Sequence, residues 1–161
     1  MAQREEILTA VNHALREVGA LCTFYSQLVA DRLGINSTDL ECLDIIVLRD
    51  GVAAGDLARA TGLTTGAVTG VIDRLERAGF ARRAADPLDR RRVLVQPAAD
   101  VQQRIAPLYA PMERFAGDAL AGFDETQLAF ALAFLGRLQN AGLAAADALK
   151  AEGHHPVASR L

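Results

Sequence analysis

The sequence predicts a mainly α-helical fold that carries one small β-hairpin. Three observations lead to this prediction. Apolar residues recur with a helical period over long stretches at both ends of the chain, two short helical segments are separated by glycine in the middle, and a short apolar run follows them beside turn residues. Of the 161 residues, 51% are hydrophobic, so the chain can bury a core.

The first long helix is predicted over residues 3–33. Gly34 ends it, because glycine is common just after a helix. Asn36 then begins a second helix as its N-cap, with Asp39 at the third helical position in a variant of the capping box, and this helix is expected to reach Gly51. The apolar stripe of the first helix is Ile7, Leu8, Val11, Leu15, Val18, Cys22, Tyr25, Val29 and Leu33.

Two short helices are predicted around a tight turn at Gly62. A helix-turn-helix needs a small residue where the helices cross, a turn residue that tolerates positive φ, and a branched apolar residue that faces inward. Ala58, Gly62 and Val68 meet these needs at offsets of four and six. Thr64 is the expected N-cap of the second short helix, and Gly79 closes that helix. Its buried stripe is Val68, Val71, Ile72 and Leu75.

A β-hairpin is predicted directly after the helix-turn-helix. Residues 81–83 and 92–95 are the two strands, residues 86–89 (Asp-Pro-Leu-Asp) supply the turn, and Pro97 ends the second strand. A hairpin in this position makes residues 35–99 a winged helix-turn-helix lobe, with the hairpin as its wing.

The helical period then returns for two more helices. Pro107 and Pro111 lie inside the first of them, so a kink is expected there. Asp124 and Gln127 form a capping pair for the last helix, which runs to about Lys150. The first stripe is Val101, Ile105, Leu108, Met112, Phe115, Ala119 and Phe123, and the second is Leu128, Leu132, Leu135, Leu138 and Leu143.

Charge is segregated along the chain. The formal net charge is −3, but residues 55–98 contain eight Arg against five acidic residues, whereas the remainder carries −6. A local excess of Arg is what a surface that contacts phosphates requires. The middle of the chain is therefore the part expected to face nucleic acid.

The composition argues against several other classes of protein. No run of eighteen or more apolar residues occurs, which argues against a membrane span, and the acidic N-terminus lacks an apolar signal core, so a cytoplasmic protein is expected. The histidines His13, His154 and His155 lack a third ligand at useful spacing, so no metal site is predicted. No catalytic or cofactor-binding motif is found, and we expect neither a cofactor nor an enzyme.

The outward face of the second short helix is expected to read double-stranded DNA. The N-terminal end of such a helix enters the major groove, where Thr can touch a base edge or a methyl group. Outward glycines permit close approach at a cost of about 1 kcal/mol each in helix propensity, and the alternative is that they pack against a neighbouring helix. Asp73 lies on the same face. The residues expected to contact DNA are Thr64, Thr65, Gly66, Thr69, Gly70, Arg74 and Arg77.

Three consecutive arginines lie at or near the tip of the hairpin. Arg inserted into a narrow minor groove meets concentrated negative potential, and flanking Arg can pair with phosphates. Asp86 and Asp89 suit the role of holding an Arg in one geometry. A solvated charge run is the alternative. Because the run directly follows a helix-turn-helix, we expect DNA contacts from Asp89, Arg90 and Arg91.

These segments resemble the MarR-type family of transcriptional regulators. Residues 79–83 (GFARR), 86–91 (DPLDRR) and 93–95 (VLV) look like the family's wing signature, and residues 55–58 (GDLA) and 71–76 (VIDRLE) are similar to its two reading helices. The resemblance implies a winged-helix lobe on each subunit and a dimer lobe made of the N- and C-terminal helices. It also implies that Arg91 reaches the minor groove and that Asp89 orients it.

The resemblance further implies a small, often aromatic or anionic, effector between the two kinds of lobe. Its expected lining is Tyr25, Leu28, Cys42, Ile46 and Phe115, although ordinary core packing is the alternative for each of them. Binding of such an effector would shift the population away from geometries that fit DNA.

The expected organisation is a dimerisation lobe (1–34 and 100–150), the winged lobe (35–99) and a flexible tail (151–161). Two long apolar stripes with no partner in a small lobe are readily covered by a two-fold partner, so a homodimer is expected. Its two reading helices would lie about 34 Å apart, which predicts a pseudo-palindromic operator. The function expected is transcriptional regulation, with repression as the predicted mode.

Two alternatives stay open. One is a thiol-based redox regulator of the same fold that uses Cys22 or Cys42. Neither cysteine has a basic residue three or four positions away, and both lie among apolar neighbours, so reduced, buried thiols are expected. The other is a protein-interaction module with a non-functional winged helix, which salt-dependent binding to duplex DNA would exclude.

Overall fold

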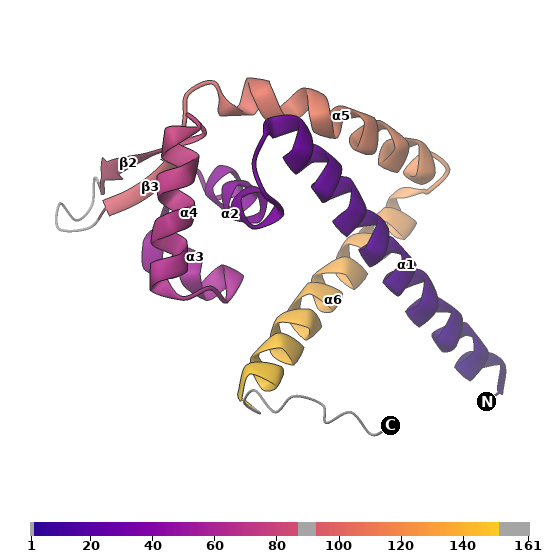
Figure 1. Cartoon of the computed structure of the whole chain (residues 1–161). Helices are drawn as coiled ribbons and strands as arrows, with labels where there is room; N and C mark the ends of the chain where they lie inside the picture. The colour runs from indigo at the N-terminus through magenta and orange to yellow at the C-terminus, as the bar shows by residue number, and fades with distance from the viewer. Residues whose placement is uncertain (1, 87–92, 152–161) are drawn as a thin grey trace, which may run out of the picture. The chain divides into compact units, whose positions relative to one another are not determined.

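The computed structural model describes residues 2–86 and 93–151, and it divides into two compact units, Met1–Ala110 and Pro111–Leu161. The chain is mostly helical with a small antiparallel sheet, which confirms the predicted fold class (Figure 1). The boundary between the units falls inside a helix and next to Pro111. The assignment of residues 1–34 and 100–150 to one dimerisation lobe therefore stays a prediction.

The helices begin and end close to where their capping signals place them. One helix passes through both Pro107 and Pro111, and the kink expected there stays a prediction. The second helix ends at Leu48 and not at Gly51, because Asp50 (φ 50°) and Gly51 (φ 120°) leave helical geometry. The helices are α1 (Ala2–Leu33), α2 (Ser37–Leu48), α3 (Ala54–Thr61), α4 (Thr65–Arg77), α5 (Val101–Leu120) and α6 (Glu125–Ala151).

Three strands form one antiparallel sheet in the order β1-β3-β2. The two predicted strands are β2 (Ala81–Ala85) and β3 (Val93–Pro97), and Pro97 ends β3 as expected. Strand β1 (Val52–Ala53) was not predicted, since two residues are too short for a periodic pattern. In register, Val52 and Arg83 both lie opposite Val95, so β3 is the central strand.

The predicted caps are present. The side-chain oxygen of Asn36 accepts a hydrogen bond from the Asp39 amide at 2.8 Å, and the Thr64 hydroxyl accepts from the Ala67 amide at 3.2 Å. Gly62 has φ 73°, so the turn between α3 and α4 uses the left-handed region for which a glycine was expected. The second unit has a reciprocal capping pair of Asp124 and Gln127, with amide-to-oxygen distances of 2.8 and 2.9 Å.

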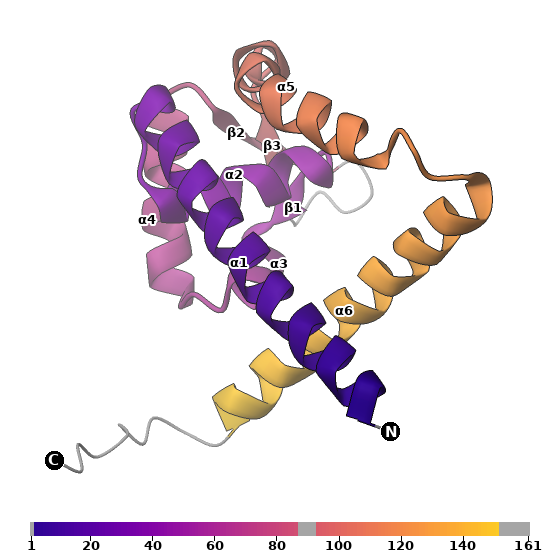
Figure 2. The ribbon, with the colours of Figure 1, turned by 90° about the vertical axis from the view of Figure 1, so that its right-hand side faces the viewer.

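The core of the first unit lies where α2, α3 and α4 meet the sheet (Figure 2). All four inward residues predicted for α4 belong to it. A smaller cluster of Val29, Ala30 and Leu40 joins α1 to α2. The largest fully buried side chains are Phe80, Leu40, Leu43, Ile46, Leu57, Ile72, Leu75, Val68, Val71, Val95 and Cys42.

Large apolar side chains remain exposed on α1 and on α6. On α6 they include Leu128, Phe130, Leu132, Phe134, Leu135, Leu138, Leu143 and Leu149; on α1 they include Ile7, Leu8, Val11, Val18, Leu21, Phe24 and Leu28. Cys22 is exposed too, which corrects the expectation that both thiols are buried. By length and mean hydropathy (1.3), residues 125–149 are able to span a membrane, although polar residues interrupt their apolar sequence. A helix that associates with another helix passes the same test.

Candidate nucleic-acid interface

Helix α4 presents a polar outward face beside the strands of the wing. Its inward residues are 0–1% exposed, and this burial fixes the rotation of the helix on the core. Thr65, Gly66, Thr69 and Arg77 are consequently exposed, and Gly70 is partly exposed. The predicted assignment of inward and outward residues is thus confirmed for these positions.

The two outward glycines leave space above the helix. A Cβ atom placed on Gly66 would meet no heavy atom within 4 Å, and one on Gly70 would meet the Nη1 atom of Arg74 at 3.4 Å. Among the described residues, neither glycine therefore packs against a neighbouring helix. The space above these glycines leaves this face of α4 open to the close approach of a ligand.

The threonines of α4 have different roles. Thr64 is committed to the N-cap, whereas the Thr69 hydroxyl donates to the Thr65 carbonyl oxygen at 3.0 Å. Because that bond uses the hydroxyl proton, Thr69 presents an acceptor and a methyl group to solvent. Both groups suit a base edge in the major groove.

Arg74 binds a buried carboxylate on α2. Its Nε lies 2.9 Å from Asp39 Oδ2, and its Nη2 lies 2.6 Å from Asp39 Oδ1. The Asp39 side chain is 3% exposed and also accepts from Asn36 Nδ2 at 2.9 Å, whereas Arg74 is 46% exposed. Hydrogen bonding to Asp39 raises the pKa of Arg74 above its ordinary value. The pairing of its guanidinium with Asp39 means that Arg74 holds α4 against the start of α2, and its expected DNA contact stays a prediction.

A second ion-pair cluster joins α4 to the first strand of the wing. Arg83 on β2 donates from Nη2 to Asp73 at 2.8 Å, pairs through Nη1 with Glu76, and donates its backbone amide to Glu76 at 2.8 Å. The hydrogen bond with Asp73, with further contributions from Glu76, raises the pKa of Arg83. Sequence reasoning missed this cluster, because each of the three residues is also typical of an exposed surface.

Arg104 at the start of α5 covers the end of α4. Its guanidinium carbon lies 3.9 Å from the ring centre of Phe80, and its Nη1 donates to the Gly79 carbonyl oxygen at 3.0 Å. A cation over an aromatic ring and at a helix C-terminus is favourable on both counts. The first turn of α5 is thereby tied to the end of α4.

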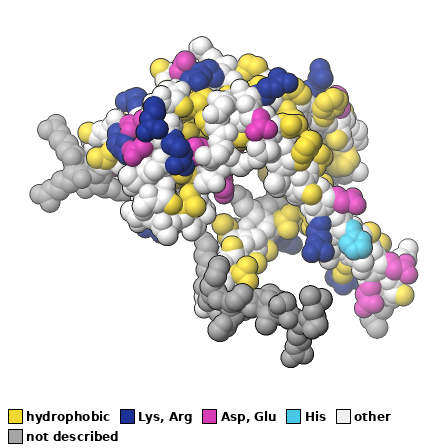
Figure 3. All heavy atoms as spheres, viewed as in Figure 1, with side chains coloured by type: hydrophobic (Ala, Val, Ile, Leu, Met, Phe, Trp, Pro, Cys, Tyr) yellow, Lys and Arg dark blue, Asp and Glu magenta, His cyan; other side chains and the backbone are white. Residues whose placement is uncertain are grey.

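The predicted wing contacts lie outside the described residues. These are Asp89, Arg90 and Arg91, together with the Arg92 that completes the arginine run. Of the described wing residues, Asp86 is buried and Arg82 is exposed. Basic and acidic side chains gather side by side over α4 and β2 (Figure 3), as the pairs around Asp73 require.

The four predicted effector-lining residues of the first unit lie in different surroundings, and the fifth belongs to the second unit. Cys42 and Ile46 are 0% exposed in the core of the winged lobe, and Tyr25 packs against the smaller cluster and donates to the Leu108 carbonyl oxygen at 2.6 Å. Leu28 is 45% exposed, and Phe115 belongs to the second unit and is 62% exposed.

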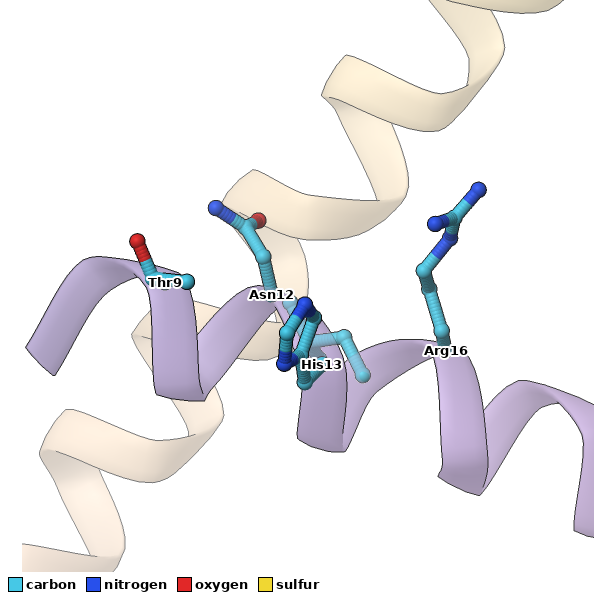
Figure 4. A pocket seen from close by; sticks show the side chains of 5 residues that line it. Thr9, Asn12, His13 and Arg16 are labelled. Atoms are coloured by element: carbon cyan, nitrogen blue, oxygen red, sulfur yellow. The ribbon is translucent and has the colours of Figure 1, made fainter. Parts of the chain in front are cut away.

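A pocket of about 500 Å3 lies on α1. It is lined by Thr9, Asn12, His13, Leu15 and Arg16 (Figure 4), all from one helix and none among the predicted effector residues. We assign it no function.

Cys42 lacks the properties of a redox-sensing thiol. Burial, together with the nearby Glu41 and Asp39 carboxylates, raises its pKa from 9.0 to about 11. A sensing thiol needs the reverse, a lowered pKa and access to solvent. The exposed Cys22 is therefore the better candidate for the redox alternative.

Comparisons with known proteins agree on one family. The sequence model of the MarR family matches residues 35–93. The HTH-type transcriptional regulator YcgE of Bacillus subtilis is 34% identical over 134 residues, which cover 83% of this chain and 87% of that protein. The structure resembles a mutant of MepR from a multidrug-resistant S. aureus isolate (TM-score 0.69, 16% identity, 81% of this chain and 96% of that one) and the transcriptional regulator PA4135 (TM-score 0.58, 25% identity, 80% and 95%).

Proposed function

Because this chain belongs to the MarR family of transcriptional regulators, we propose that it acts as a homodimer that binds a pseudo-palindromic DNA operator and represses transcription in the cytoplasm. Helix α4 enters the major groove and the wing reaches the adjacent minor groove. The protein binds DNA and catalyses no reaction.

The outward face of α4 is the observation that carries the proposal. Thr65 and Thr69 are exposed, Gly66 faces open space, and Arg77 follows one turn after Asp73 on the same face. Glycine in a helix is unfavourable by about 1 kcal/mol relative to Ala. A helix face that keeps destabilising glycines beside exposed threonines is suited to close contact with the sugar-phosphate backbone and base edges of duplex DNA.

The apolar residues of α1 and α6 support the homodimer. Fully burying a side chain such as Leu or Phe contributes about 1.5–3 kcal/mol, and these helices expose many of them. Large exposed apolar surfaces mark association sites. A second copy of the chain is the partner that presents the same surface under two-fold symmetry.

Selection of bound duplexes from a random-sequence pool tests the DNA-binding function. The expected result is an enriched site with two inverted half-sites about one helical turn apart. Affinity for this selected duplex should fall steeply as salt rises, because Arg contacts to phosphate release counterions. A protein that enriches no sequence and binds no duplex in a salt-sensitive way is not a DNA-binding regulator.

The wing is tested by Arg91→Ala, with Arg4→Ala as the control. Loss of the predicted minor-groove contact should weaken binding to the selected duplex by about 1–3 kcal/mol, whereas the control should change it little. Equal effects of the two substitutions would remove the wing from the proposed interface.

Release by a small-molecule effector is also part of the proposal. Its support is the family resemblance, and in this chain Cys42 and Ile46 offer no exposed surface to a ligand. A thermal-shift screen of small aromatic and anionic compounds is the direct test. We expect at least one compound that stabilises the protein and weakens its binding to the selected duplex.

A further inference from the structure

The proposed DNA-contacting face of α4 contains a carboxylate near its centre. Asp73 lies four residues after Thr69 and four before Arg77, and residues at this spacing are neighbours on one face of a helix. Its side chain is 49% exposed, and the Glu76 side chain is 31% exposed. Two negative charges therefore lie on a surface that is proposed to approach phosphates.

The cations of α4 do not balance these charges. The helix carries Arg74 and Arg77, and the Arg74 guanidinium is already bound to the buried Asp39. With that pair counted as neutral, the remaining charges of α4 are those of Asp73, Glu76 and Arg77, a net −1. A negative recognition helix would repel DNA at the distance where contact begins.

Arg83 restores the balance from outside the helix. It contacts both Asp73 and Glu76, and its backbone amide also donates to Glu76, which fixes the first strand of the wing to α4. Because the three side chains are 31–49% exposed, water screens the pair interactions, and their contribution to fold stability is small. Screening matters less at a DNA surface, where water is displaced and the local phosphate charge is high.

We infer that Arg83 is a charge-neutralising residue of the DNA interface: it pairs with the carboxylates of Asp73 and Glu76 and offsets the negative charge that they would present to phosphate. This inference rests on the proposed DNA-binding function. Arg83 acts through the two carboxylates and makes no essential phosphate contact of its own.

Two simpler roles, a phosphate contact by Arg83 and base reading by Asp73, predict different results. If Arg83 were a direct phosphate contact, its removal would cost affinity whatever happens to Asp73 and Glu76. If Asp73 instead read a cytosine amino group, as carboxylates can, Asp73→Asn alone would weaken binding to the selected duplex. The neutralising role predicts that removal of all three charges together restores affinity.

The test compares five variants with the wild type on the duplex that the wild type selects, across a range of salt concentrations. They are Arg83→Met, Asp73→Asn, the Asp73→Asn/Glu76→Gln double variant, the triple variant that combines the double variant with Arg83→Met, and Arg4→Met as a matched loss of one cation far from the interface. Circular dichroism and thermal unfolding establish that each variant is folded. The Arg83→Met and triple variants both lack the ion-pair cluster, so a difference between them reports on charge and not on folding.

Arg83→Met should weaken binding about tenfold or more, and the triple variant should return to within about threefold of the wild type. The double variant should bind at least as well as the wild type, and the control should change little. The slope of log affinity against log salt should be the same for the triple variant and the wild type. A slope for the triple variant that is smaller by about 0.9, the effect of one lost phosphate contact, would overturn the inference. A triple variant that binds as weakly as Arg83→Met would overturn it too, as would an Asp73→Asn variant that binds more weakly than the wild type. If the wild type itself binds no duplex, the proposed function fails first and the inference fails with it.

Discussion

Replacing Gly66 with Ala is expected to stabilise the fold while weakening its binding to DNA. Gly66 is the second residue of α4, and a Cβ atom there meets nothing within 4 Å inside the chain. The new methyl group therefore causes no clash in the free protein, and Ala favours the helix. In the proposed complex the same methyl group occupies the space that the glycine leaves for the duplex.

The two effects have different magnitudes and opposite signs. Ala in place of Gly in a helix contributes roughly 0.5–1 kcal/mol, which corresponds to a rise in Tm of about 1–4 °C for a chain of this length. An extra methyl group in a filled contact costs typically about 1–3 kcal/mol, or roughly fivefold to more than a hundredfold in affinity. Binding should suffer more than stability gains.

Urea unfolding and fluorescence anisotropy on the selected duplex measure the two effects separately. Gly117→Ala is the matched control, because Gly117 is also helical and exposed, and a Cβ atom there also meets nothing within 4 Å. It lies off the predicted apolar stripe of α5, so it should stabilise the protein and leave DNA affinity unchanged.

A Gly66→Ala protein that binds as tightly as the wild type would refute the close approach of DNA to this face. Equal losses of affinity in the Gly66 and Gly117 variants would refute it as well, because the effect would then come from helix stability in general. Tighter binding would mean that helix formation, and not the fit to a groove, limits affinity.

Other perturbations separate stability from DNA contact. Arg74→Met should lower the free energy of unfolding by about 3 kcal/mol, because it leaves the buried Asp39 carboxylate without its cation. Asp39→Asn should lower it by about half as much, because water reaches the guanidinium that remains. Equal losses in urea titrations of the two variants would contradict the assignment of Asp39 as the buried partner. Thr64→Ala should cost about 1 kcal/mol through loss of the N-cap, and no change would mean that the freed amide finds another acceptor. The Cys42 thiol should stay unreactive toward a thiol reagent until urea unfolds the protein. The folded state raises the pKa of Cys42 from 9.0 to about 11. The stability that the neutral thiol contributes is therefore complete below pH 9 and is lost as pH rises toward 11. Cys42→Ala should flatten the dependence of unfolding free energy on pH in this range.

Local signals predicted most of the fold of the first unit. Asn36 and Thr64 each satisfy an amide within three residues, and Gly62 adopts the positive φ that its turn requires. These features depend on the chemistry of a few consecutive residues, so the sequence alone determines them. The two-residue strand β1 depends instead on pairing with β3, and no local pattern indicates it.

The candidate site was harder to predict, because its ion pairs join residues far apart in the chain. Asp39 and Arg74 are 35 residues apart, and each already has a sufficient local explanation, as a capping residue and as an outward cation. Arg83 is similarly explained by the basic character of the wing. Only the packing of α2 and β2 on α4 decides which charges neutralise one another, and that packing is a tertiary property.

The charge pattern of α4 also bears on the proposed homodimer. When the pairing of Arg74 with Asp39 and of Arg83 with Asp73 and Glu76 is counted, the positive charge of Arg77 leaves α4 and its partners with no net charge. The outward face of α4 then consists largely of Thr and Gly. Such a face makes few contacts, so one copy should bind a half-site weakly. Two linked copies make the second binding event intramolecular and multiply the affinity without any new contact. In the proposed homodimer the exposed apolar side chains of α1 and α6 would link the two copies. Dilution that dissociates this dimer should then abolish tight DNA binding, while each chain stays folded around the core of its first unit.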